Sequence, residues 1–190
     1  MSRIEREPFS FVTGPSPFGP VALVWEDHGG RPRIRRILLS RPGLPAPRAV
    51  QKTFPGIKSS TCVEIDHLAD QIQAFLQGED IGFSLDNARL DLCSTFQQNV
   101  LRAEYGIPRG SISTYQRIAR HLGRPSSARA VGMALARNPF PIIIPCHRAI
   151  RANGQLGGYQ GGVAMKRKLL EMEGITFDDS GYVTTRKYFY

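Results

Sequence analysis

Short runs of apolar residues separated by turn residues predict β-strands near the start of the chain. Residues 9–13 and 21–26 are β-rich and flank Gly14-Pro15-Ser16-Pro17, a pattern typical of neighbouring antiparallel strands. Residues 35–39 provide a third apolar run, and residues 81–85 alternate between apolar and polar positions as a strand does. A small sheet is therefore expected.

One helix accompanies this sheet. Apolar side chains recur at helical spacing over residues 65–76, and Gly78 supplies a stop. Residues 41–47 are rich in proline and are predicted to form a loop without regular structure. We therefore interpret residues 1–90 as a small α+β domain, and its sequence reveals no chemistry of its own.

The second half of the chain is patterned for helices with clear starts. Ser94-Thr95-Phe96-Gln97 has the capping-box form, with serine at the N-cap, and predicts a helix over residues 95–104. Ser113-Thr114-Tyr115-Gln116 repeats that form and opens a second helix. A third helix follows over residues 128–137, and Asn138-Pro139 stops it. The last two have the outline of a helix-turn-helix, although helical hairpins without a DNA role are common.

The charge is concentrated in this helical half. Residues 1–90 carry 11 Lys/Arg against 10 Asp/Glu, a net +1, whereas residues 91–190 carry 14 against 6, a net +8. A basic domain beside a nearly neutral one favours a polyanionic partner such as nucleic acid, and a solvated surface excess is the alternative.

Composition excludes several other classes of protein. No run of apolar residues is long enough to span a membrane, and the charged start, residues 1–9, lacks the apolar core of a signal peptide, so a soluble intracellular protein is expected. Cys62, Cys93 and Cys146 are too few and too scattered for a disulfide framework, and no pair has zinc-site spacing. We predict reduced thiols and no metal site.

The strongest chemical signal is the segment 140–148, an apolar run braced by two prolines that ends on Cys146, His147 and Arg148. Burial before the cysteine and polarity after it would place the sulfur at the floor of a pocket with a cationic rim. Adjacent side chains of an extended segment face opposite ways, so we expect His147 to act through a bridging water. Glu173, after a helical pattern over residues 163–172, is the candidate carboxylate that orients it. A buried core cysteine is the alternative interpretation.

A set of motifs in the second half resembles the methylated-DNA–protein-cysteine methyltransferase family. They cover about half of the chain, and Pro-Cys-His-Arg together with Asn-Pro and Arg-Ala-Val-Gly is highly specific. In order they are Ile107-Pro108 with Gly110, Ser113-Thr114-Tyr115, Ala128-Arg129-Ala130-Val131-Gly132, Asn138-Pro139, Ile144-Pro145-Cys146-His147-Arg148 and Gly158-Tyr159-Gln160-Gly161-Gly162. For residues 1–90 this family implies a ribonuclease-H-like sheet, for residues 91–175 a DNA-binding and alkyl-acceptor domain with a helix-turn-helix, and residues 176–190 are left as a C-terminal tail.

The resemblance implies a reaction and its residues. Cys146 would accept a methyl or alkyl group from the exocyclic oxygen of a damaged guanine, once and irreversibly, because a thioether has no ready leaving group. His147, a water and Glu173 would activate the thiol, and Tyr115 would supply a proton to the departing base. Asn138 would hold the segment that carries the cysteine. The reaction needs no cofactor.

The same resemblance implies how the lesion in double-stranded DNA reaches the thiol. The base must rotate out of the duplex, approached from the minor groove, and Arg129 would fill the gap. The other expected DNA contacts are Thr114, Ala128, Ala130, Gly132 and Arg148. The expected base pocket comprises Leu135, Pro141, Tyr159, Gln160 and Gly161, and Gln160 stands where the family usually has a small residue. A monomer is expected, in the cytoplasm or, in a eukaryote, the nucleus.

Three rival interpretations make different predictions. A relative with tryptophan in place of the cysteine binds lesions without repair, but this chain has Cys146. A transcription regulator using the helix-turn-helix alone would bind undamaged duplex, and it leaves Pro-Cys-His-Arg without a purpose. A hydrolase with a Cys146–His147 dyad would turn over repeatedly. The range of alkyl groups accepted, activity on methylated thymine and the roles of Cys62, Cys93 and the tail stay open.

Overall fold

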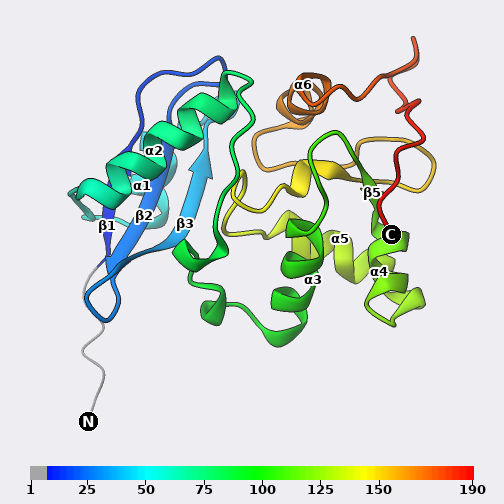
Figure 1. The fold of residues 1–190 in the computed structure, drawn as a ribbon. Helices are drawn as coiled ribbons and strands as arrows, with labels where there is room; N and C mark the ends of the chain where they lie inside the picture. The colour runs from blue at the N-terminus through cyan, green and yellow to red at the C-terminus, as the bar shows by residue number, and fades with distance from the viewer. Residues whose placement is uncertain (1–7) are drawn as a thin grey trace. The chain divides into compact units, whose positions relative to one another are not determined.

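The computed structural model describes residues 8–190, and they divide into two compact units, with the boundary along the chain between Leu92 and Cys93 (Figure 1). The charged start used above to argue against a signal peptide lies mostly in residues 1–7, outside the described part. Both units combine helices with a sheet, so the α+β class is confirmed. In residues 8–190, no helix is long and apolar enough to cross a membrane.

The first unit is built on a four-stranded sheet in the order β3-β2-β1-β4. Strand β2 pairs antiparallel with both β1 and β3, and β4 pairs parallel with β1. The strands are β1 (Phe9–Val12), β2 (Val21–Asp27), β3 (Pro32–Leu39) and β4 (Lys58–Ser59). Six successive residues of β2 are buried, because the strand is covered on both faces.

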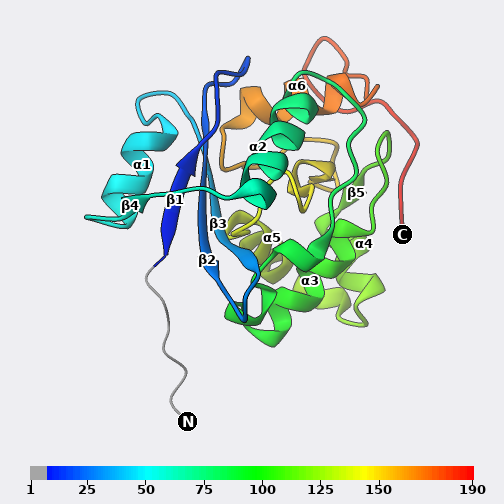
Figure 2. The same ribbon diagram turned by 60° about the vertical axis from the view of Figure 1, so that its left-hand side comes forward.

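Two helices of this unit lie on opposite sides of the sheet, which Figure 2 shows nearly edge-on. They are α1 (Ala46–Thr53) and α2 (Val63–Leu76). The first packs Ala46 and Val50 against Ala22 and Val24 of β2. Helix α2 confirms the helix expected over residues 65–76, although it begins two residues earlier, at Val63.

Two expectations for this unit were wrong. The proline-rich loop does not extend through residue 47, since α1 begins at Ala46 with a proline in its first turn, where the missing N–H would have no helical partner. Residues 81–85 form no strand and lead into the short 3-10 helix η1 (Leu85–Asn87), followed by η2 (Leu90–Leu92). An alternating pattern needs a partner strand, and no pairing involves residues 81–85.

The second unit holds four α-helices and a two-stranded parallel sheet among its residues. The helices are α3 (Thr95–Tyr105), α4 (Tyr115–His121), α5 (Ala128–Ala136) and α6 (Val163–Met172), joined by the 3-10 helices η3 (Pro125–Ser127) and η4 (Cys146–Arg148). Strand β5 (Ser113–Thr114) pairs with β6 (Ala149–Ile150). All four α-helices lie where the sequence predicts them, within a residue or two.

Hydroxyl groups cap two of these helices. The Ser94 hydroxyl accepts a hydrogen bond from the Gln97 N–H, as the capping-box pattern predicts. At the start of α4 the cap is Thr114, which accepts from the Arg117 N–H. The prediction of Ser113 there was wrong by one residue, because Ser113 is held in β5 and donates its hydroxyl to the Phe189 carbonyl.

The C-terminal segment, residues 176–190, belongs to the second unit. The Ile112 N–H donates to the Lys187 carbonyl, and the Phe189 N–H donates to the Ile112 carbonyl. A buried apolar cluster joins this segment to the rest of the unit through Ile112, Ile150, Leu156, Leu170, Ile175 and Val183. The segment therefore packs as part of this unit rather than as a separate tail.

Candidate active site

A buried turn presents Cys146. The Asn138 side chain holds both ends of this turn, accepting from the Phe140 N–H and donating to the Ile144 carbonyl. Within the turn Ile142 has a φ of 76°, a left-handed conformation that strongly disfavours a β-branched side chain. Such strain persists only where the surroundings hold it, and residues 140–150 are all buried. The expected role of Asn138 in bracing the cysteine segment agrees with this geometry.

The Cys146 thiol is nearly inaccessible, with 7% of the residue exposed. Burial raises the pKa of this thiol to about 12, and a hydrogen bond from Asn138 opposes the shift only in part. The group is therefore a neutral thiol at rest and needs a base before it can act as a nucleophile.

A buried charge network lies beside the cysteine. His147 is fully buried, and its Nε2 lies 2.9 Å from Glu173 Oε1. Arg148 donates its Nε and Nη2 to the two oxygens of Glu173, at 2.9 and 2.8 Å, and its Nη1 to the Ile107 carbonyl. Burial alone would raise the pKa of Glu173, but the hydrogen bonds of His147 and Arg148 and the charge of Arg148 hold it well below its usual value. Burial lowers the pKa of His147, so the imidazole is neutral and can accept a proton.

Two expectations about this network must be revised in light of the geometry. The Cys146–Arg148 segment is a 3-10 helix and not an extended strand, so the alternation used to place His147 does not apply. Arg148 was expected to contact DNA, but it is 8% exposed and its guanidinium is committed to Glu173 and to a backbone carbonyl. Its position makes it a support for the carboxylate that faces His147.

The parallel pairing of β5 with β6 brings Tyr115 to the cysteine. Strand β5 leads directly into α4, whose first residue is Tyr115, and β6 directly follows the 3-10 helix that carries Cys146. The tyrosine ring lies between two glycines: a Cβ built at Gly132 would be 3.8 Å from the ring, and one at Gly157 would be 2.7 Å from the hydroxyl. Only glycine leaves room for the Tyr115 hydroxyl at position 157, where φ is also positive.

A cavity of about 190 Å³ opens onto the cysteine. That is the liquid volume of roughly six water molecules, enough for one flat ring system and too small for a base pair. Its lining includes Cys146, Tyr115 and the expected pocket residues Leu135, Tyr159 and Gln160, together with Gly132, Ala136, Arg151, Gly157 and Gly158. Pro141 and Gly161, also expected there, are buried and are not among the lining residues.

Two polar atoms near this cavity have no hydrogen-bond partner within residues 8–190. They are the Tyr159 hydroxyl and Gln160 Oε1, and both are buried. Burial raises the pKa of Tyr159 well above its usual value, so the hydroxyl stays protonated and can donate. Buried groups of this kind are normally satisfied, and a polar ligand in the cavity would satisfy them.

The residues expected to contact DNA divide into exposed and enclosed groups. Arg129 and Ala130 of α5 are exposed, and Ala128 and Gly132 of the same helix are half-buried. Thr114 is 5% exposed and serves as the cap of α4. The geometry is compatible with DNA contact along α5, whereas Thr114 is enclosed by the protein.

Sequence reasoning missed three charged residues of the site. Lys166 is fully buried and its Nζ donates to the Ala149 and Leu156 carbonyls, both at 2.6 Å, which ties β6 to the loop lining the cavity. Glu104 is also fully buried. Both occupy the apolar stripe of their helices, and a charge in that position was the available signal. The third, Arg151, lines the cavity and is exposed.

The family model described as "6-O-methylguanine DNA methyltransferase, DNA binding domain" matches residues 95–175. The chain is 46% identical over 120 residues to a methylated-DNA–protein-cysteine methyltransferase of Methanothermobacter thermautotrophicus, which covers 63% of this chain and 67% of the relative. It is 35% identical over 166 residues to a protein of the same name from Methanosarcina barkeri, covering 83% of this chain and 92% of that one. This chain belongs to the methylated-DNA–protein-cysteine methyltransferase family.

A solved structure extends the methyltransferase likeness to both units. The crystal structure of Mycobacterium tuberculosis OGT in complex with DNA is 32% identical and covers 88% of this chain and 92% of that chain, with a TM-score of 0.65. The resemblance drawn from the motifs is thus confirmed. Among residues 8–190, no group of three or more His, Cys, Asp or Glu could hold a metal ion.

Proposed function

We propose that this protein repairs DNA by transferring a methyl or larger alkyl group from O6 of guanine to its own Cys146 in one irreversible turnover. The observation that carries the proposal is a neutral, buried thiol at a cavity sized for a single base, next to a neutral imidazole held by a carboxylate. A buried sulfur cannot reach a base inside a duplex, so the damaged base must rotate into the cavity.

The transfer is a displacement at saturated carbon. The Cys146 sulfur bonds to the alkyl carbon as the bond from that carbon to O6 breaks, and the thiol proton passes through a water to His147. Glu173 stabilises the imidazolium that forms. Tyr115 donates a proton to the guanine ring as the base leaves, and burial, which raises the pKa of Tyr115 to about 12, keeps that proton in place beforehand. The product thioether has no leaving group, so the protein is consumed.

We infer that DNA lies along α5. Helices α4 and α5 pack together through the turn at Gly123, which supports a helix-turn-helix. Arg129, exposed at the start of α5, would enter the minor groove and fill the gap left by the rotated base, and the small residues Ala128, Ala130 and Gly132 would allow close approach of the DNA backbone. The sheet order and the parallel β1–β4 pair of the first unit support a ribonuclease-H-like fold for it.

The test is peptide mass analysis after reaction with a duplex carrying one O6-methylguanine. The expected result is a single methyl-sized gain on the peptide containing Cys146, saturating at one per protein. Cys146→Ala should show none, and Cys62→Ala, a matched control at a half-buried cysteine outside the site, should react as wild type. Repeated turnover on an ester or amide would favour the hydrolase instead, and lesion binding without transfer would leave a damage sensor.

A further inference from the structure

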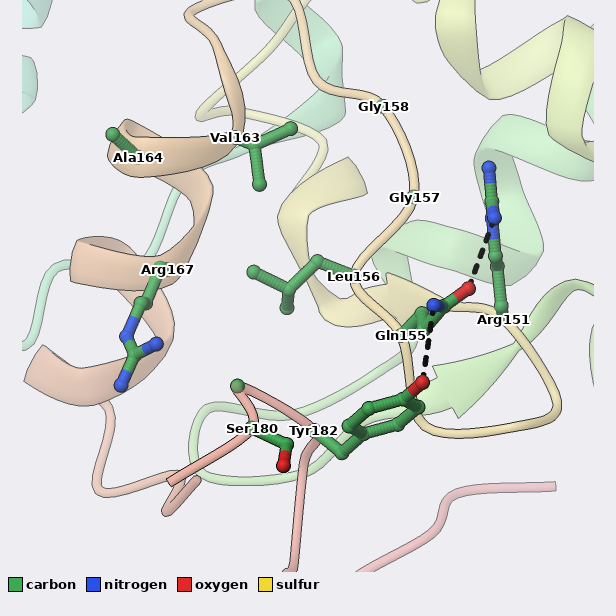
Figure 3. A pocket seen from close by; sticks show the side chains of 11 residues that line it. Arg151, Gln155, Leu156, Gly157, Gly158, Val163, Ala164, Arg167, Ser180 and Tyr182 are labelled. Carbon is green, nitrogen blue, oxygen red and sulfur yellow. Dashed lines mark hydrogen bonds between the residues drawn. The ribbon is translucent and has the colours of Figure 1, made fainter. Parts of the chain in front are cut away.

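A second, larger cavity of about 580 Å³ adjoins the base cavity, and Arg151 is the charged residue that lines both. Figure 3 shows it with Arg151 on one side and Arg167 of α6 on the other. The two cavities also share Gly157 and Gly158. Arg151 therefore lies at the boundary between the base cavity and the larger cavity outside it.

Hydrogen bonds restrict the position of Arg151. Its Nη1 donates to Gln155 Oε1 at 3.1 Å, and Gln155 Nε2 donates to the Tyr182 hydroxyl at 3.3 Å (Figure 3). The backbone closes the same turn, since the Arg151 N–H donates to the Gln155 carbonyl. The Val183 N–H donates to the Gly154 carbonyl and fastens the turn to the C-terminal segment. An arginine held in place loses less entropy when it binds a ligand.

The neighbouring arginine is engaged differently. Arg167 donates to Glu171 at 2.9 Å, and its guanidinium lies 4.7 Å from the centroid of the Phe177 ring. Arg167 has an acidic partner and an aromatic face, whereas within residues 8–190 the Arg151 guanidinium hydrogen-bonds the neutral amide of Gln155 and no carboxylate. Of the two, Arg151 retains the uncompensated positive charge.

A base that enters the cavity carries its sugar and two flanking phosphates to the rim. Guanidinium groups bind phosphate oxygens through paired, charge-assisted hydrogen bonds. We propose that Arg151 binds a phosphate next to the rotated nucleotide and so holds that nucleotide at the cavity. This inference rests on the proposed function and adds an anion-binding residue that the motifs do not contain.

The experiment measures the rate of methyl transfer from duplex DNA by Arg151→Gln, with Arg167→Gln as the control of equal charge change. For Arg151→Gln we expect a loss of roughly tenfold, the size of one charge-assisted contact. The slope of log rate against log salt should also decrease by about one. Arg167→Gln should stay close to wild type. Thermal unfolding followed by circular dichroism should be the same in all three proteins and shows that each is folded. Transfer from an O6-alkylguanine free base, which has no phosphate, should lose much less than tenfold in Arg151→Gln, because only the contact of Arg151 with the cavity is changed.

A second set of duplexes replaces the phosphate on either side of the lesion, in turn, with an uncharged methylphosphonate. On one of them wild type and Arg151→Gln should react at the same rate, because the charge that Arg151 binds is gone. An unchanged tenfold gap on both neutral duplexes, or equal losses in both arginine variants, would overturn the assignment. Failure of wild type to alkylate Cys146 with any substrate would instead contradict the proposed function.

Discussion

Glu104→Gln tests how the buried carboxyl of α3 affects stability. No side chain within residues 8–190 hydrogen-bonds the carboxyl of Glu104, and the Ala149 N–H is the backbone donor nearest to it. Burial raises its pKa from 4.5 to about 8, although the charges of Lys166 and Arg148 oppose the rise. At roughly 1.4 kcal/mol per pH unit, that difference corresponds to about 5 kcal/mol, the largest change expected.

The sign follows from proton binding. Between pH 4.5 and about 8 the folded state binds one proton more than the unfolded state, so the stability contributed by Glu104 is complete below pH 4.5 and is lost as the pH rises through 8. Lys166 has the opposite effect on stability, because burial lowers its pKa from 10.5 to about 8. Its contribution to stability therefore rises with pH, and does so above pH 8. Glutamine keeps the shape of the side chain without titrating, so stability of the variant should not show this decline.

Denaturant unfolding at several values between pH 5 and 8 is the measurement. Far-ultraviolet circular dichroism or amide exchange of α3 and α6 should be followed, since the only tryptophan, Trp25, belongs to the first unit. Over this range the difference in unfolding free energy between variant and wild type should grow in favour of glutamine by up to about 4 kcal/mol. His147 and Glu173 are present in both proteins, so their titration largely cancels. Parallel curves across this range would refute the reasoning.

Three further substitutions have defined outcomes. Gly157→Ala forces a positive φ on alanine at a cost of about 1–2 kcal/mol and pushes its Cβ against the Tyr115 hydroxyl. The midpoint temperature of thermal unfolding should fall and methyl transfer should slow. An unchanged rate would show that the position of the tyrosine is not critical. Lys166→Met leaves the Ala149 and Leu156 carbonyls without their donor and should destabilise the second unit by about 2–3 kcal/mol, with faster amide exchange in residues 149–158; normal exchange there would argue against the tether. Gln160→Ser enlarges the cavity and should raise the rate for benzyl more than for methyl lesions; an equal change for both would separate Gln160 from alkyl selection.

The starts and ends of helices could be predicted from the sequence where they depend on neighbouring residues. Ser94 caps α3 and Asn138-Pro139 follows the end of α5 because caps and stops act over a few residues. The start of α1 was missed since proline is favourable in a first turn as well as in a loop. The Ser113–Thr114 ambiguity could not be resolved locally, because pairing with residues 149–150 decides which hydroxyl is free to cap.

In the candidate active site, too, the residues of a local motif could be predicted and their tertiary contacts could not. Cys146 and His147 were identifiable from their motif, but their contacts come from segments distant in sequence. Whether Arg148 faces DNA or Glu173 depends on tertiary packing that no short pattern encodes. Lys166 and Glu104 resemble the surface charges found on most helices until the packing of the second unit encloses them.

The sharing of Glu173 by an imidazole and a guanidinium has an evolutionary consequence. One carboxylate satisfies both His147 and Arg148, and Arg148 also secures the Ile107 carbonyl. Any single replacement leaves a buried charge or donor without its complement, which selection would remove before a second replacement arose. A lineage can therefore exchange these three residues only as a set, and they should be inherited together even where the surrounding apolar side chains drift.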